Sequence, residues 1–106
     1  MPRSSPAIAV MPEAVMSSLV LFGAHLRTAR QRRDESLRTM AARIGTSIPT
    51  LRRMEAGDPK VAIGVYATAL WIFGKASTLG DILEPASDEY ATMLDVDRAD
   101  RRRARR

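Results

Sequence analysis

The 106-residue sequence contains no cysteine and only one histidine, His25. Without cysteine, the chain cannot form disulfides, bind zinc through thiolates or use a cysteine nucleophile. With a single histidine, a serine/histidine relay has only one possible base, and a metal site with several histidine ligands cannot form. We therefore expect no enzyme, no metal site and no cofactor, and we interpret His25 as a surface residue.

Long hydrophobic runs are also missing. No segment approaches the roughly 18–20 uninterrupted apolar residues of a membrane span. The apolar N-terminal stretch is broken by Pro2, Pro6 and Pro12 and has no basic segment followed by a continuous apolar one, as a signal peptide would. We expect a cytoplasmic, nucleoid-associated protein without membrane contact. The choice of translation start stays open between Met1, Met11 and Met16.

Charge is abundant and unevenly distributed. Arginine supplies 15 of the 17 basic residues, and the net charge is +5. Residues 19–57 carry +5, residues 58–97 carry −5 and residues 98–106 carry +5. Guanidinium groups suit phosphate oxygens and guanine edges better than ammonium groups do. We expect the first basic block to meet a polyanion and the acidic block a different partner, with plain solubility as the alternative.

Apolar spacing and end signals predict an all-α fold of five helices, at residues 18–33, 37–44, 48–56, 61–73 and 78–84. Gly45 and Gly57 stand where helices must end, and Ser47 can cap the helix that follows it. We therefore expect a flexible arm at residues 1–17, one helical domain at residues 18–84, and an acidic, then arginine-rich, flexible tail at residues 85–106.

The second and third predicted helices, with a glycine turn between them, have the layout of a helix-turn-helix motif, whose second helix enters the DNA major groove. Their sequence, LRTMAARIGTSIPTLRRMEAG, resembles the phage-repressor/Cro (XRE) type. That family's motif has a small residue fifth, glycine ninth, and aliphatic residues fifteenth and eighteenth. Those positions are held here by Ala41, Gly45, Leu51 and Met54.

The resemblance also implies an architectural contact between Arg30 and Glu55. In the family, an arginine on the first helix pairs with a glutamate at the end of the reading helix. Such a pair would hold the reading helix against the first helix, and it contributes about 1 kcal/mol if half exposed. The alternative is that both side chains are solvated.

Four side chains of the third predicted helix are expected to contact bases. Arg52 is the first candidate for O6 and N7 of guanine, and Arg53 suits either guanine or a phosphate. Thr50 and Ile48 offer contacts to thymine methyl groups. The motif departs from the phage repressors at Leu37, Ile48 and Pro49, so their base-recognition rules do not carry over.

A second set of residues is expected to contact the DNA backbone. Thr46, Ser47 and the amides at the start of the third helix are placed for phosphate oxygens, because a helix N-terminus attracts anions. Arg38 and Arg43 on the second helix suit phosphates as well, with plain solvation as the alternative.

Residues beyond the motif predict a subunit or partner surface. The family usually binds palindromic operators as two-fold dimers, with half-sites about 34 Å apart or a multiple of it. The apolar side chains available for such an interface, or for another partner, are Trp71, Leu79, Ile82 and Leu83. For Trp71, packing under a loop is the alternative.

A second resemblance concerns residues 58–74, DPKVAIGVYATALWIFG, with the acidic and arginine-rich segments that follow. This stretch is similar to the HipB-like antitoxins, which are encoded with HipA-type kinase toxins. The resemblance implies a dimeric autorepressor that also binds its toxin, with Trp71 and residues 81–97 as candidate toxin contacts.

Other interpretations stay open at this point. The chain could be a phage-type or metabolic operon repressor without a toxin, or a protein-interaction module that has lost DNA reading. The arginine-rich end, residues 98–106, could be a clamp on phosphates, a partner-binding segment that becomes ordered on contact, or a solubilising end.

Overall fold

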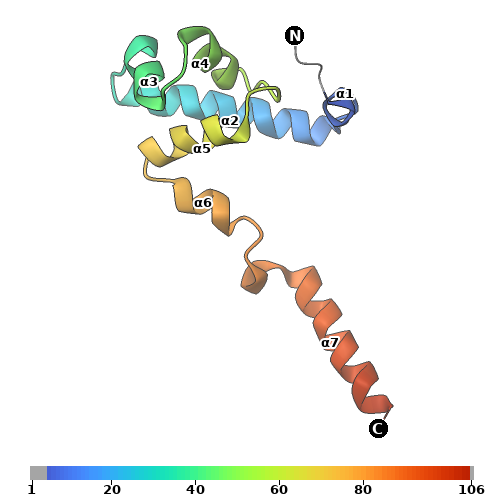
Figure 1. The fold of residues 1–106 in the computed structure, drawn as a ribbon. Coiled ribbons are helices and arrows are strands. Elements are labelled where there is room, and N and C mark those ends of the chain that lie inside the picture. The colour runs from blue at the N-terminus through green and yellow to red at the C-terminus, as the bar shows by residue number, and fades with distance from the viewer. Residues whose placement is uncertain (1–4, 106) are drawn as a thin grey trace. The chain divides into compact units, whose positions relative to one another are not determined.

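A computed structural model describes residues 5–105, and these residues are helical or in loops (Figure 1). The chain divides into two compact units, Met1–Lys75 and Ala76–Arg106, and each is described here by itself. The helices are α1 (Pro6–Ala9), α2 (Glu13–Arg32), α3 (Leu37–Ile44), α4 (Ile48–Glu55), α5 (Ile63–Ile72), α6 (Ala76–Asp81), the 3-10 turn η1 (Pro85–Ser87) and α7 (Glu89–Ala104).

The all-α class is confirmed, but the predicted number of five helices is wrong. Within residues 5–105 there are seven α-helices, because α1 and α7 form in stretches that were assigned to the arm and the tail. Residues 1–4 of the arm and Arg106 of the tail lie outside the described residues.

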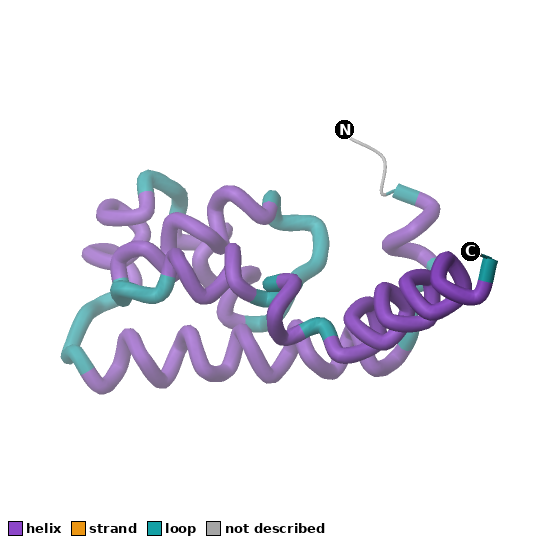
Figure 2. The backbone as a smooth tube through the Cα atoms, turned by 90° about the horizontal axis from the view of Figure 1, so that it is seen from below, coloured by secondary structure: helices purple, strands orange, loops and turns teal. Residues whose placement is uncertain are grey.

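Helix α2 begins five residues before the predicted start. Pro12 immediately precedes it, and Glu13 in its first turn interacts favourably with the positive end of the helix dipole. The apolar side chains of this added turn, such as Val15 and Met16, are exposed. Because they do not face the core, they do not show the apolar spacing from which we predicted the helix, and the predicted start was therefore too late. Figure 2 traces α2 as one unbroken helix.

Two serines and a glycine set the bounds of α3 and α4. The Oγ atoms of Ser36 and Ser47 each accept a hydrogen bond, at 3.1 Å, from the amide three residues on. Gly45 ends α3 in a left-handed conformation with φ of 85°. These local signals explain why α3 has its predicted bounds and α4 ends within one residue of them.

The core of the N-terminal unit is centred on the motif. Met40, Leu51 and Met54, from α3 and α4, are completely buried. Leu26 of α2 and Ala69 of α5 belong to the same core; α4 packs on both α2 and α3, and α3 also packs on α5. The motif is therefore held by two flanking helices rather than standing alone.

The helices after the motif differ slightly from their predicted bounds. Helix α5 is shorter than predicted, and Gly74 follows it in a left-handed conformation with φ of 73°. Helix α6 starts two residues before the predicted Thr78 and ends at Asp81. No helix in the described part of the chain combines the length and the apolar character that crossing a membrane requires.

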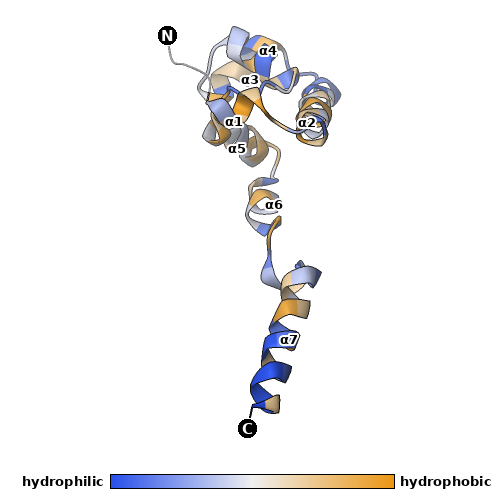
Figure 3. Ribbon diagram, turned by 90° about the vertical axis from the view of Figure 1, so that its right-hand side faces the viewer, coloured by the Kyte–Doolittle hydropathy of each residue, from blue (hydrophilic) through white to orange (hydrophobic). Residues whose placement is uncertain are grey.

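Helix α7 includes residues that were predicted to be disordered. Asp88 caps it by accepting a hydrogen bond from the Ala91 amide at 3.1 Å. Acidic residues near its start and arginines in its last turn both match the helix dipole, and arginine is a good helix former. Figure 3 shows the C-terminal half of α7 as strongly hydrophilic. None of the side chains of α6 or α7 is buried.

Candidate nucleic-acid interface

Helix α4 presents a narrow exposed face opposite its buried one. Leu51 and Met54 fix one side of the helix in the core. Four exposed residues at i, i+3, i+4 and i+7 lie on the other side. These four, which we call the outer face of α4, are Pro49, Arg52, Arg53 and Ala56. The two guanidinium groups therefore have only a proline and an alanine beside them on this face, and both of these side chains are shorter than that of arginine.

Asp58 holds the guanidinium of Arg53. Its Oδ2 accepts a hydrogen bond from Arg53 Nε at 2.8 Å, and its Oδ1 accepts one from the Lys60 amide at 2.8 Å. The Arg53 hydrogen bond, followed by that of the Lys60 amide, lowers the pKa of Asp58 below its ordinary value. Because the pair uses only Nε, both terminal nitrogens of Arg53 keep their hydrogens for another acceptor.

The loop that carries Asp58 is itself anchored to α5. The Tyr66 hydroxyl donates a hydrogen bond to the Asp58 carbonyl oxygen at 2.7 Å. Burial raises the pKa of this tyrosine, and its ring lies 5.5 Å from that of Phe22, centroid to centroid. Asp58 is therefore a fixed support for Arg53.

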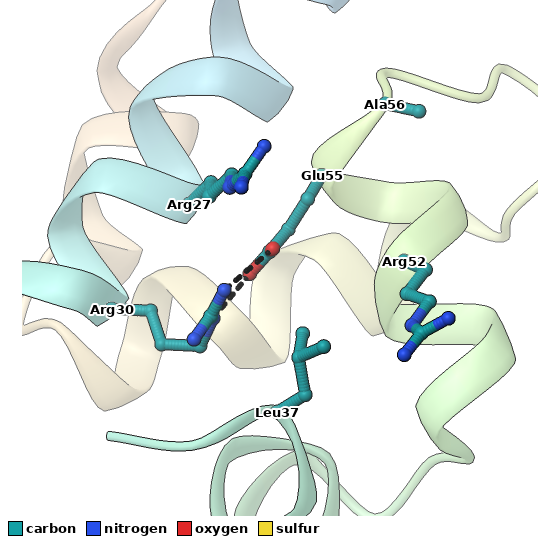
Figure 4. A pocket seen from close by; sticks show the side chains of 6 residues that line it. All are labelled: Arg27, Arg30, Leu37, Arg52, Glu55 and Ala56. Atoms are coloured by element: carbon teal, nitrogen blue, oxygen red, sulfur yellow. Dashed lines mark hydrogen bonds and ion pairs between the residues drawn. The ribbon is translucent and has the colours of Figure 1, made fainter. Parts of the chain in front are cut away.

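A buried ion pair joins α4 to α2, as the family resemblance implied. Arg30 Nε lies 2.7 Å from Glu55 Oε2 and Nη2 lies 3.1 Å from Oε1, while Nη1 donates to the Glu35 carbonyl at 2.9 Å (Figure 4). The side chains are only 10% and 7% exposed, so the pair is not half exposed. Hydrogen bonding to Glu55 raises the pKa of Arg30, against the effect of burial.

Two glycines bring the backbones of α2 and the end of α4 into direct contact. A Cβ atom on Gly23 would lie 2.6 Å from the Gly57 nitrogen and 2.7 Å from the Glu55 carbonyl oxygen. Gly57 is left-handed, with φ of 78°, and a Cβ there would lie 2.5 Å from the Leu19 carbonyl oxygen. We did not single out Gly23 from the sequence, although a glycine inside a helical pattern is a known sign of close packing.

A basic hollow lies beside α4. This pocket has a volume of about 420 Å³. Figure 4 shows Arg27 from α2 and Arg52 from α4 on opposite sides of the buried ion pair. Neither arginine makes an ion pair with another residue in the described range 5–105. We did not predict from the sequence that Arg27 belongs to this site. The residues that line the hollow are Arg27, Arg30, Leu37, Arg52, Glu55 and Ala56.

The residues predicted to contact phosphates have different surroundings. Arg38 is exposed, whereas Arg43 pairs with Glu35. Ser47 is exposed, and Thr46 is half-buried with its amide bonded to the Ala41 carbonyl at 2.9 Å. Their contacts with DNA stay predictions.

The first turn of α4 has fewer amides to offer than we expected. Pro49 has no N–H, and the Thr50 amide is bonded to Ser47 Oγ. A phosphate at this end of the helix would therefore have to use the amides of Ser47 and Ile48.

The residues predicted to contact bases also differ in accessibility. Ile48 is half-buried and packs against the core, and the Thr50 hydroxyl accepts a hydrogen bond from Ser47 Oγ at 2.9 Å. Arg52 and Arg53 are exposed. The two arginines are thus the most accessible of the four, and the role of each residue stays a prediction.

The predicted partner residues belong to different units. Trp71 lies on α5 and is 68% exposed, which is inconsistent with packing under a loop. Leu79, Ile82 and Leu83 belong to the C-terminal unit, where Leu79 is half-buried while Ile82 and Leu83 are exposed.

Comparison with known proteins gives one match. A family model described as a helix-turn-helix domain matches residues 21–74, just over half of the chain. The matched segment runs from within α2 to the glycine after α5, so it includes all of α3, α4 and α5. No curated protein and no solved structure matches.

Proposed function

The chain belongs to the helix-turn-helix domain family, and we propose that it is a sequence-specific repressor of transcription that reads double-stranded DNA through α4. A helix-turn-helix domain indicates a DNA-binding regulator. The observation that carries the proposal is the outer face of α4, where two exposed arginines stand on a helix that is capped and bound to α2.

The dimensions of α4 suit a major groove. An α-helix with its side chains is about 10–12 Å in diameter, and the groove is about 12 Å wide. Arginine forms two parallel hydrogen bonds with O6 and N7 of guanine. Arg52 is the first candidate for this contact, and Arg53 can make it with its two terminal nitrogens while Asp58 holds its Nε.

Electrostatics favours the same surface. Helices α3 and α4 carry four arginines and one acidic residue, Glu55, whose charge is neutralised by Arg30. Phosphate contacts come from Arg38 and Arg43 of α3 and from Arg27 at the edge of the basic hollow. Such contacts fix the position of the protein on the duplex without reading its sequence.

Selection from a library of random duplexes tests the proposal. The wild-type chain should enrich one sequence, and Arg52→Ala with Arg53→Ala should lose the preference by about 1–3 kcal/mol for each base contact removed. The matched control removes the same charge elsewhere, through Arg32→Ala with Arg103→Ala, and should keep the preference. If the wild type enriches nothing, the repressor proposal fails and an interaction module is the better account.

We further propose that the protein is the antitoxin of a toxin-antitoxin pair, a cytoplasmic, non-catalytic homodimer that represses its own operon. The similarity of residues 58–74 to HipB-like antitoxins and the exposed Trp71 support a HipA-like kinase partner. Co-expression with the product of the adjacent gene should give a stable complex that Trp71→Ala weakens. A neighbouring gene unrelated to kinases would favour an operon repressor without a toxin.

A further inference from the structure

Four arginines form a continuous face on α7, three within the helix and one at its C-cap. They stand at i, i+3, i+4 and i+7, within about 100° of the helix circumference at 3.6 residues per turn. They line a shallow hollow of about 220 Å³ to which none of the other residues between 5 and 105 contributes. We call them the arginine face: Arg98, Arg101, Arg102 and Arg105.

Helix stability alone does not account for this clustering. Like charges at i and i+4 destabilise a helix, and the arginine face has two such pairs, Arg98/Arg102 and Arg101/Arg105. The helix dipole favours cations only in the last turn, whereas Arg98 lies before that turn. An acidic residue within the arginine face would relieve this repulsion, but Asp100 lies on the opposite side of the helix, 3.7 Å from Arg103. A bound polyanion would remove this repulsion.

The single ion pair on the face leaves it strongly basic. Arg98 lies 3.1 Å from Asp95, but the two side chains are 64% and 73% exposed, so solvent screens the interaction. The other three arginines make no ion pair with any residue between 5 and 105. The charge of the face is therefore available to a ligand.

The density of charge on the face fits duplex DNA. Four arginines over seven residue steps span about 10 Å. Duplex DNA carries one phosphate charge per 1.7 Å or so of axis, hence about six over that length. We propose that the arginine face binds the sugar–phosphate backbone of double-stranded DNA, as a contact separate from the reading of bases by α4. This inference rests on the proposed function for its ligand, but not on the base contacts of α4.

The inference is tested by the salt dependence of binding, measured with the whole 106-residue chain and a random-sequence duplex of about 30 base pairs. Each neutralised phosphate adds about 0.9 to the slope of log K against log salt. Arg102→Gln should lower the slope by about 0.9, and all four substitutions together by about 3–4. Arg103→Gln, the adjacent residue off the face, changes the net charge equally and should leave the slope unaltered. Glutamine preserves helix propensity, and circular dichroism checks the helix content.

Several outcomes would overturn the inference. Equal changes for Arg102→Gln and Arg103→Gln would show unspecific attraction by net charge, and no change in either would show that the face touches no phosphate. Competition by poly-glutamate or a single strand as strong as that by duplex would point to an acidic protein or an unpaired strand. A sequence preference that persists with an unchanged slope refutes this inference alone, whereas an Arg102-specific slope without sequence preference refutes only the reading by α4.

Discussion

The position of the reading helix depends on a few residues at the C-terminal end of α4. Gly23 and Gly57 allow the backbones of α2 and of the end of α4 to touch there. Arg30 and Glu55 connect the same two helices through a buried ion pair. Asp58, just beyond, holds Arg53. These residues contact no DNA in our account, but they determine where the two outer-face arginines stand.

Gly23→Ala should destabilise the protein, because its new methyl group would overlap backbone atoms of Glu55 and Gly57 that cannot rotate away. Overpacking costs about 1–3 kcal/mol or more, against a helix-propensity gain of about 0.5–1 kcal/mol. A net loss of about 1 kcal/mol lowers Tm by about 4–8 °C in a domain of this size. Gly64→Ala is the control, since a Cβ there meets nothing within 4 Å, and it should leave Tm unchanged or raise it. An unchanged Tm for Gly23→Ala would contradict the close approach.

Glu55→Ala should cost more, because it leaves the buried guanidinium of Arg30 without its partner. Breaking a buried ion pair in this way costs about 3–5 kcal/mol. The control is Asp95→Ala, which removes the exposed pair with Arg98 and should change stability by at most about 0.5 kcal/mol. Urea unfolding measures both values. Equal, small losses would show that the buried pair is not an architectural contact.

Asp58→Asn should remove a pH dependence of stability. The pKa of Asp58 is lowered in the folded state by Arg53 and the Lys60 amide, so the folded protein favours the carboxylate. Its contribution is therefore complete above the unfolded pKa of about 3.9 and is lost as the pH falls through the lower folded value. The stability difference between wild type and Asp58→Asn should be constant near pH 7 and shrink below about pH 4. A difference that stays constant down to pH 2 would contradict the assignment.

Residues of this kind are only partly predictable from sequence. The Arg30–Glu55 contact followed from the family resemblance, since both residues belong to its recurring pattern. The roles of Gly23 and Asp58 depend on which backbone atoms and side chains meet across a helix crossing and a loop. A glycine inside a helical pattern indicates close packing but does not identify the partner, so the structure was needed to find these contacts.

At the scale of whole elements, helix bounds could be predicted where a capping residue begins or ends the helix. Ser36, Gly45 and Ser47 act within their own turn, so the bounds of α3 and α4 could be predicted closely. The start of α2 and all of α7 were missed because few of their side chains enter a core. Without burial there is no apolar periodicity, and helix formation then depends on capping and charge.

Helix α7 should therefore exchange its amide hydrogens much faster than the motif helices. None of its side chains is buried, so only local interactions oppose its opening. Amides of α3 and α4, around the buried Met40 and Leu51, should show protection close to the global free energy of unfolding. Hydrogen exchange followed by NMR measures both, and added duplex DNA should slow exchange in α7. Equal protection of α7 and α4 in the free protein would contradict this account.

At the scale of the whole molecule, we expect a dimer. One short helix reads few base pairs, and a two-fold dimer doubles the contacts on a palindrome. Exposed apolar side chains, Trp71 and Ile63 on α5 among them, are available for self-association. Light scattering at micromolar concentration should give about twice the chain mass of 11.7 kDa. A mass of one chain, both free and on selected DNA, would rule out the dimer.

The sorting of charge along the chain places two basic segments, the motif and the end of α7, on either side of an acidic one. The central claim concerns the first of these, namely that the arginines on the outer face of α4 contact guanine edges in the major groove. Guanine N7 lies in that groove, so methylation at N7 tests the contact directly.

Methylation interference on the selected duplex is thus the decisive measurement. In each half-site, N7 methylation of one or two guanines should block binding by the wild type, and the block should vanish at one of these guanines in Arg52→Ala or Arg53→Ala. Interference that is absent, or that is identical in the wild type and both variants, would contradict the account.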